Sequence, residues 1–214
     1  MFVNIDPYTK FIRLWLITMF LLVIVIIIIG GLTRLTDSGL SITEWELFKG
    51  VLPPLNIDQW NFYFNEYKKI PEYKSINYNI SIDEFKVIFY WEYLHRIIAR
   101  FIGLFFFIPL IYFYFSGKIK KKHINICFLI FVLIVFQGII GWYMVMSGLV
   151  NDITVSHYRL SIHLSTAILI ISTIFWLIKN IITNKNKLFF KFSKSNLLFQ
   201  FFILLIFIQI IMGA

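Results

Sequence analysis

The sequence predicts an all-α protein, a polytopic bundle of membrane-spanning helices. Apolar and aromatic residues of the set AVILMFWYC make up 59% of the 214 residues, charged residues make up only 14%, and the mean hydropathy is +0.81. A soluble domain is nearer half apolar and a quarter charged, and disorder requires low hydrophobicity. The single cysteine excludes an intramolecular disulfide and a cysteine metal cluster. At about 20 residues per span, the chain has room for five spans and one substantial loop.

Five apolar runs define the expected helices. The first, Phe11 to Gly31, is too long for a signal peptide and lacks a cleavage site, so we expect an uncleaved helix. The others follow at 87–116, 124–146, 156–178 and 197–214. The last run stops at Ala214 without a polar anchor, which is unusual for a helix end at a membrane face. We therefore expect the chain to be a piece of a longer protein.

Basic residues mark alternate connections between these runs. They precede the first run, cluster at 118–122 and recur through 179–194. The positive-inside rule places these three segments in the cytoplasm of a multi-pass cell (inner) membrane protein. The N-terminus is then cytoplasmic and the loop 32–86 lies outside. The net charge of +9 is thus an orientation signal, and we expect a lipid environment and no nucleic-acid partner.

The outer loop at 32–86 is long and rich in aromatic residues, including Trp45, Trp60, Phe62, Tyr63 and Tyr67. Long loops in compact proteins tend to be functional or to have structure of their own. Because aromatic side chains suit the membrane interface, we expect short amphipathic helices here. A plain connector is the alternative.

Histidines in the second and fourth runs predict a cofactor site. Ionisable groups are costly inside a membrane, so each needs an explanation. His95 and His163 lie about equally far into runs that both cross from outside to inside. Two histidines at one level of a helical bundle can hold an iron porphyrin from opposite faces. The alternative for each is an interhelical hydrogen bond.

Charged residues near these histidines extend the predicted site. Glu92 and His95, three residues apart, share one helix face. Glu92 is either a support for the ligand or an acid/base beside the porphyrin edge, and the alternative is a structural partner for Arg96 or for another helix. The candidates to bind the carboxylates of such a cofactor are the basic residues Arg96, Arg100 and Arg159.

Several motifs, in order along the chain, resemble the haem A synthase family. They are GGLTRLTDSGLS at 30–41, EYLHR at 92–96, QG with GWYMV at 137–145, SGL at 147–149, and YRL with HL at 158–164. The resemblance runs almost unbroken from Gly30 to Leu164. It implies eight membrane helices in two similar four-helix halves, each with a pair of histidines for a haem. Residues 1–179 would then be the N-terminal four-helix half, 180–196 a cytoplasmic loop, and 197–214 the truncated first helix of a second half.

The resemblance also implies the chemistry. The family converts haem O to haem A by oxidising one porphyrin methyl group to a formyl group, for the assembly of terminal oxidases. Carried over residue by residue, it implies His95 and His163 as axial ligands of the substrate haem and Glu92 as the catalytic carboxylate. Haem b would belong to the missing half, without which the activity of this chain alone is open. Haem O synthase and the cytochrome oxidase assembly machinery are the implied partners, and a homo-oligomer stays open.

The outer loop lacks the cysteine pair found in one bacterial branch, so the chain is similar to the proteobacterial and mitochondrial branch. His157 lies where the family varies, and it is not assigned as a ligand. Two other functions stay open on the residues alone. A b-type cytochrome subunit, an electron carrier with a bis-histidine haem, would need the histidines but neither Glu92 nor the long loop. A transporter or assembly factor would bind no haem.

Overall fold

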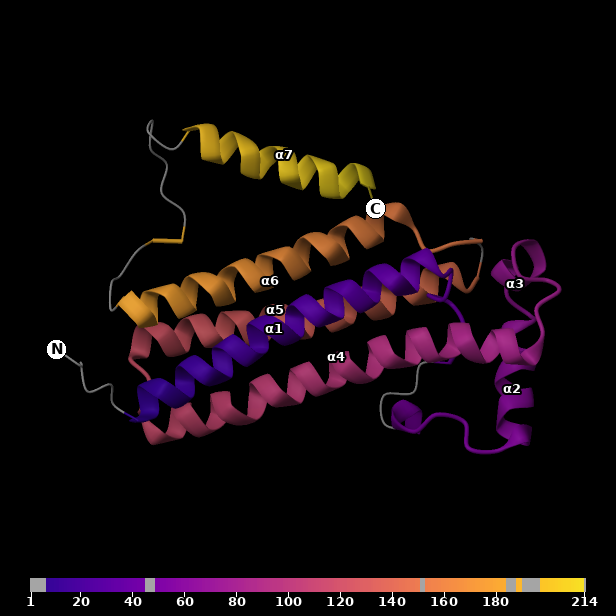
Figure 1. Ribbon diagram of the computed structural model, residues 1–214, viewed down its shortest axis with the longest axis horizontal. Helices are drawn as coiled ribbons and strands as arrows, with labels where there is room; N and C mark the ends of the chain where they lie inside the picture. The colour runs from indigo at the N-terminus through magenta and orange to yellow at the C-terminus, as the bar shows by residue number, and fades with distance from the viewer. Residues whose placement is uncertain (1–6, 45–48, 151–152, 184–187, 190–196, 214) are drawn as a thin grey trace. The chain divides into compact units, whose positions relative to one another are not determined.

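The computed structural model describes residues 7–44, 49–150, 153–183, 188–189 and 197–213, and within these ranges every regular element is helical (Figure 1). The elements are α1 (Pro7–Leu35), the 3-10 turn η1 (Lys49–Val51), α2 (Ile57–Tyr67), α3 (Pro71–Ser75), α4 (Ile82–Ser116), α5 (Lys121–Gly148), α6 (His157–Thr183) and α7 (Leu197–Gly213). Four of them, α1, α4, α5 and α6, are long and apolar enough to cross a membrane. The expectation of an all-α, multi-pass membrane bundle is therefore confirmed.

The helices extend beyond the apolar runs that predicted them. Helix α4 begins at Ile82, five residues before the expected start at Val87. Its N-terminus carries a capping box, in which the Ser81 backbone N–H donates to Glu84 (2.7 Å) and the Glu84 N–H donates to the Ser81 hydroxyl (3.3 Å). Helix α1 begins at Pro7, a residue suited to the first helical position. Polar first turns of this kind are invisible to a hydropathy pattern.

The chain divides into two compact units. Unit 1 contains residues 1–25, 101–137 and 161–214, and unit 2 contains residues 26–100 and 138–160. Helices α1, α4 and α5 therefore contribute residues to both units, and α6 belongs to unit 1 except for its first turn.

Unit 1 is a closed four-helix arrangement, in which each helix contacts two others. Trp15–Phe106 joins α1 to α4, Phe107–Phe131 joins α4 to α5, Gln137–His163 joins α5 to α6, and Phe20–Phe175 joins α6 back to α1. The buried face of α6 includes the small or polar residues Ser161, Thr166, Ala167 and Thr173. Small residues let helices approach closely where lipid offers no hydrophobic driving force.

Helix α7 is the fifth expected helix, and it is shorter than the four spans. It has 17 residues, and none of those described is buried. The Ser161 hydroxyl of α6 donates a hydrogen bond to the carbonyl of Ile211 in α7 (3.3 Å). Helix α7 therefore contacts the bundle while exposing its apolar side chains.

A four-residue turn, residues 117–120, joins α4 to α5 within unit 1. Gly117 has a φ of +63°, a left-handed conformation that glycine adopts readily and that commonly terminates a helix. The Lys118 ammonium group lies 4.2 Å from the centre of the Tyr8 ring. The turn is thus short, defined and positively charged.

The loop 32–86 contains short helices within unit 2, as expected. Asn56 caps α2 by accepting a hydrogen bond from the Gln59 backbone N–H (2.9 Å), and Trp60 packs edge-on against Phe89 of α4 (5.0 Å between ring centres). The loop shares one apolar core with the ends of α4 and α5, formed by Leu40, Ile42, Trp60, Phe64, Tyr67, Ile70, Phe85, Phe89, Val145 and Val155. Trp45 and residues 151–152, which connect the third and fourth apolar runs, lie outside the described residues.

Candidate functional site

Glu92 on α4 is buried, with 3% of its surface exposed, and both oxygens of its carboxylate accept hydrogen bonds. Oε2 accepts from the Ser41 hydroxyl (2.7 Å) and from the backbone N–H of Ile42 (2.8 Å). Oε1 accepts from Nε of Arg96 (3.0 Å) and from its Nη2. The ion pair with Arg96, one of the alternatives for this residue, is therefore present. The same carboxylate also fastens the loop to α4.

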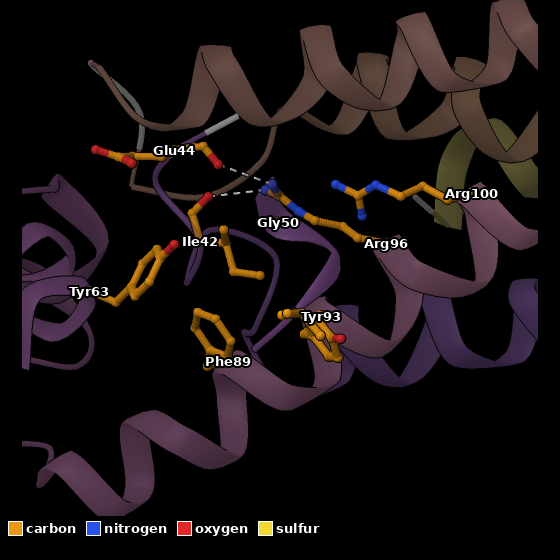
Figure 2. A pocket seen from close by; sticks show the side chains of 9 residues that line it. Ile42, Glu44, Gly50, Tyr63, Phe89, Tyr93, Arg96 and Arg100 are labelled. Carbon is orange, nitrogen blue, oxygen red and sulfur yellow. Dashed lines mark hydrogen bonds between the residues drawn. The ribbon is translucent and has the colours of Figure 1, made fainter. Parts of the chain in front are cut away.

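Arg96 fastens the same stretch of loop from the other side. Its Nη2 donates to the carbonyl of Ile42 (3.0 Å) and its Nη1 to the carbonyl of Glu44 (3.4 Å), as the dashed lines in Figure 2 show. Glu92 thus binds a donor of Ile42 while Arg96 binds its acceptor. We call this arrangement of Ser41, Ile42, Glu44, Glu92 and Arg96 the loop clasp. It fixes the segment 41–44 on α4.

His95 lies against helix α1 within unit 2. A methyl group placed on Gly30 would be 3.1 Å from Cε1 and 3.5 Å from Nδ1 of His95. The Nδ1–Cε1 edge of the imidazole therefore faces the backbone of α1 at a position that glycine leaves open. Glu92 contacts the loop, whereas His95, three residues further along α4, contacts α1.

A pocket beside the loop clasp combines positive charge with aromatic walls (Figure 2). Arg96 and Arg100 line it together with Tyr63, Phe89 and Tyr93, and the loop side is formed by Ile42, Glu44, Gly50 and Leu52. The Tyr93 hydroxyl donates to the carbonyl of Val51 (2.6 Å), which attaches a second part of the loop to α4. The free space in this pocket is about 20 Å³, which is enough for about one water molecule, so the guanidinium groups and aromatic rings pack closely around it.

Arg159, the third basic candidate, packs on α5. Its guanidinium lies 4.4 Å from the centre of the Tyr143 ring, and its Nη2 donates to the Tyr143 hydroxyl (3.4 Å). Its Nη1 is buried and has no hydrogen-bond partner among the residues that the structure describes. Arg159 therefore keeps unused donor capacity for an anion.

His163 belongs to unit 1, where Gln137 of α5 donates from Nε2 to the His163 carbonyl (2.9 Å). In the described part of the chain, His163 Nδ1 and Gln137 Oε1 are buried without a hydrogen-bond partner. Buried polar atoms are nearly always satisfied, so these two atoms call for a partner that the described residues do not supply. An imidazole with an unused buried nitrogen fits an axial ligand, whose second nitrogen usually donates to a carbonyl or water. His95 lies in unit 2, so the pairing of the two histidines stays a prediction.

The loop 32–86 also contains a buried carboxyl group that no sequence pattern indicated. Glu72 of α3 is buried, accepts a hydrogen bond from the Tyr67 hydroxyl (2.8 Å), and Asn77 donates to that same hydroxyl (2.8 Å). Burial raises the pKa of Glu72 to about 7, the bond from Tyr67 opposes this rise, and the negative charges of Glu92 and Asp37 add to it. Nothing in the sequence around Glu72 distinguishes it from an exposed glutamate, since its burial depends on the fold of the loop.

Comparisons with known proteins place this chain in one family. The sequence model of the family described as cytochrome oxidase assembly protein, COX15-CtaA, matches residues 13–214. The heme A synthase of Pelagibacter ubique (strain HTCC1062) is 57% identical over 214 residues, which is all of this chain and 63% of that protein. The heme A synthase of Rickettsia bellii (strain OSU 85-389) is 48% identical over 167 residues, 78% of this chain and 50% of the relative.

A third relative, the heme A synthase of Parvibaculum lavamentivorans, is 41% identical over 201 residues, 94% of this chain and 58% of its own length. The chain thus spans between half and two thirds of the length of these three relatives. No solved structure matches it significantly. The motifs that indicated the resemblance run from Gly30 to Leu164. The family model also matches residues outside that range, in α7 and in α1 from residue 13 onward. The chain belongs to the cytochrome oxidase assembly protein family COX15-CtaA.

Proposed function

We propose that this chain is the N-terminal part of a haem A synthase, which oxidises one methyl group of haem O to a formyl group for terminal oxidases. The observation that carries this proposal is the 57% identity, over the whole chain, to a relative named heme A synthase. The buried carboxylate of Glu92, one turn from His95 on α4, supports it. The chain covers 63% of that relative, so the proposed activity is that of the whole protein.

His95 and His163 are the proposed axial ligands of the substrate haem. One observation supports the ligand role of each histidine. For His95 it is the contact of the imidazole with Gly30, and for His163 it is the buried ring nitrogen that has no hydrogen-bond partner among the described residues. A bound haem iron supplies the redox chemistry, and the protein sets its ligands, surroundings and access to water. Haem b would be held by residues beyond those that this chain contains.

The three arginines differ in how well they suit the propionates of a haem. Arg96 already binds Glu92 and two loop carbonyls, so its main role is in the loop clasp. Arg100 lines the pocket one turn further along α4, and Arg159 has an unused buried donor. We therefore assign propionate binding first to Arg100 and Arg159.

Glu92 is the proposed catalytic carboxylate, and the loop clasp adds a condition to that role. Both of its oxygens are occupied by donors from the loop and from Arg96. To exchange a proton with substrate, Glu92 must release one donor or act through one. The Ser41 hydroxyl both donates and accepts, so it is able to pass a proton to or from Oε2.

The test uses the full-length protein in cells that make haem O but no haem A. Extracted haems are separated and quantified for the unchanged protein, for Glu92→Gln, and for Asp83→Asn as a control carboxylate exposed on the same helix. We expect haem A from the unchanged protein and from the control. Glu92→Gln should give at least about tenfold less haem A while the purified protein retains its haem absorbance.

Each contrary outcome identifies what has failed. Normal haem A production by Glu92→Gln overturns the catalytic role of Glu92. Haem bound by the unchanged protein without conversion of its methyl group identifies the b-type electron carrier instead. The absence of any haem absorbance identifies a transporter or assembly factor.

The proposed setting follows from the same function. Haem O synthase is the proposed source of the substrate, and the cytochrome oxidase assembly machinery is the proposed user of the product. The cytoplasmic N-terminus and the outer position of loop 32–86 are supported by the lysines of 118–122 and 179–194. A homo-oligomer is compatible with the exposed apolar side chains of α7.

A further inference from the structure

Two consecutive glycines, Gly30 and Gly31, lie near the end of α1, and the structure distinguishes their roles. Neither has a positive φ, so the backbone does not require glycine at either position. Glycine weakens a helix relative to alanine, so each one needs a reason. A methyl group on Gly31 would meet nothing within 4 Å, whereas one on Gly30 would meet the imidazole of His95 at 3.1 Å.

We propose that Gly30 is a positioning residue, which sets the orientation of the His95 ring by leaving room for it against α1. This inference rests on the proposed role of His95 as a haem ligand. Gly30 touches neither substrate nor iron in this proposal. It acts through the position of the imidazole.

The geometry explains why a single methyl group at this position matters. An imidazole is rigid, so its near edge cannot bend away as the end of a leucine or lysine side chain would. A contact of 3.1 Å between carbon atoms is shorter than the usual 3.5–4.0 Å separation. To relieve it, His95 must rotate about its side-chain torsions, or α1 and α4 must move apart locally. Either change alters the direction in which the ring presents its second nitrogen.

The first test compares Gly30→Ala with Gly31→Ala in the purified haem-bound protein. Both changes bring the same gain in helix propensity, so their difference isolates the contact with His95. We expect Gly30→Ala to shift the low-spin electron paramagnetic resonance signal and the midpoint potential, or to lower the haem content at least twofold. Gly31→Ala should match the unchanged protein in all three measurements. Identical spectra, potentials and haem contents for the two variants overturn the proposal.

A second test needs no haem, and it separates this inference from the proposed function. Thermal unfolding of the haem-free protein is measured for both glycine variants, each with His95 and with His95→Ala. We expect Gly30→Ala to lower the Tm by about 3 °C or more relative to Gly31→Ala when His95 is present. That difference should disappear with His95→Ala, because the ring that meets the methyl group is gone.

The outcomes of the two tests are distinguishable. If His95→Ala retains the haem spectrum, His95 is not the ligand, and the functional part of the proposal falls with it. If His95→Ala loses the haem but the two glycine variants unfold alike, the ligand assignment stands and the positioning role of Gly30 is wrong. A Tm difference that depends on His95, together with a haem spectrum that Gly30→Ala changes, supports the proposal.

Discussion

Four donor groups bind the carboxylate of Glu92, and the backbone N–H of Ile42 is one of them. The exchange rate of this N–H therefore reports whether the loop clasp is intact. The change Glu92→Gln keeps the size of the side chain but places an amide NH2 among groups that also donate. We expect the Ile42 N–H, which donates to Glu92 (2.8 Å), to exchange with solvent deuterium at least about tenfold faster. Hydrogen exchange measured on peptides that cover 36–44 checks this.

Asp83→Asn is the matched control for that experiment, because Asp83 is an exposed carboxylate on α4 that pairs with Lys86. It should leave the exchange of Ile42 unchanged. Unchanged exchange in Glu92→Gln would contradict the loop clasp as the feature that fixes segment 41–44.

Gly148 provides a second prediction for a single residue. A methyl group there would lie 2.8 Å and 2.9 Å from the two terminal carbons of Leu40, which is fully buried in the core of unit 2. The end of Leu40 must shift against its neighbours in that buried core to admit the methyl group, so Gly148→Ala should lower the free energy of unfolding by about 1–3 kcal/mol. Denaturant or thermal unfolding measures the loss. Gly138→Ala, on the same helix with nothing within 4 Å, should not show it.

The sequence predicts part of the chemistry at this scale and not the rest. Glu92 and Arg96 are four residues apart on one helix, so their pairing follows from spacing alone. Ser41 and Ile42 are about fifty residues away, and no helical or strand periodicity joins a loop to a helix. The contact of Gly30 with His95 likewise requires the packing of α1 against α4, which one sequence does not specify.

Among the elements, the short helices α2 and α3 make the outer loop sensitive to pH. The Glu72 carboxyl has an ordinary pKa near 4.5, and its pKa in the folded loop is about 7, chiefly because it is buried. The folded state therefore binds the proton more tightly than the unfolded state. The stabilisation that this group contributes is fully present below pH 4.5 and is lost as the pH rises to about 7, by on the order of 3 kcal/mol.

Limited proteolysis of the loop between pH 4.5 and 7.5 checks this prediction, with a protease that remains active across the range. Cleavage within 57–80 should become faster as the pH rises. Glutamine is similar in size to glutamate and forms hydrogen bonds, but it does not titrate. Glu72→Gln should therefore remove most of the pH dependence of the cleavage rate. A loop that becomes more resistant at higher pH would contradict the assignment of the buried carboxyl.

The elements themselves were largely predictable, and their ends were not. Apolar runs located α1, α4, α5 and α6, because a run of about 20 apolar residues has few other uses. The capping box of Ser81 and Glu84 lengthened α4 beyond its run, and hydropathy does not detect it. The aromatic content of the loop 32–86 indicated helices there. The residues at which these helices begin and end depend on local caps such as Asn56.

For the whole molecule, the orientation in the membrane is testable with introduced cysteines. Cys127 is only 1% exposed, so it adds little background to labelling by a thiol reagent that does not cross membranes. Tyr78 and Leu188 are 61% and 74% exposed, in the outer loop and in the lysine-rich segment after α6. In spheroplasts, Tyr78→Cys should react at once, whereas Leu188→Cys should react only after permeabilisation. The reverse pattern would overturn the positive-inside assignment.

The candidate site depends on the whole molecule in a way that sequence reasoning could not resolve. His95 and His163 were predicted at matched depth from their positions in two apolar runs, and the structure places them in different units. Glu92, His95, Arg96, Arg100 and Arg159 belong to unit 2, and their grouping in one site with His163 stays a prediction. The haem chemistry came from the resemblance rather than from spacing, since two histidines on two helices also suit an electron carrier.

The turn at Gly117 has a consequence for how the protein enters the membrane during synthesis. Four residues span at most about 14 Å, so the C-terminus of α4 and the N-terminus of α5 must lie close together as soon as both have left the ribosome. The two helices are then suited to partition into lipid as one antiparallel hairpin. Lysines 118 and 120–122 at its tip resist passage across the hydrocarbon, so the hairpin retains its orientation once inserted.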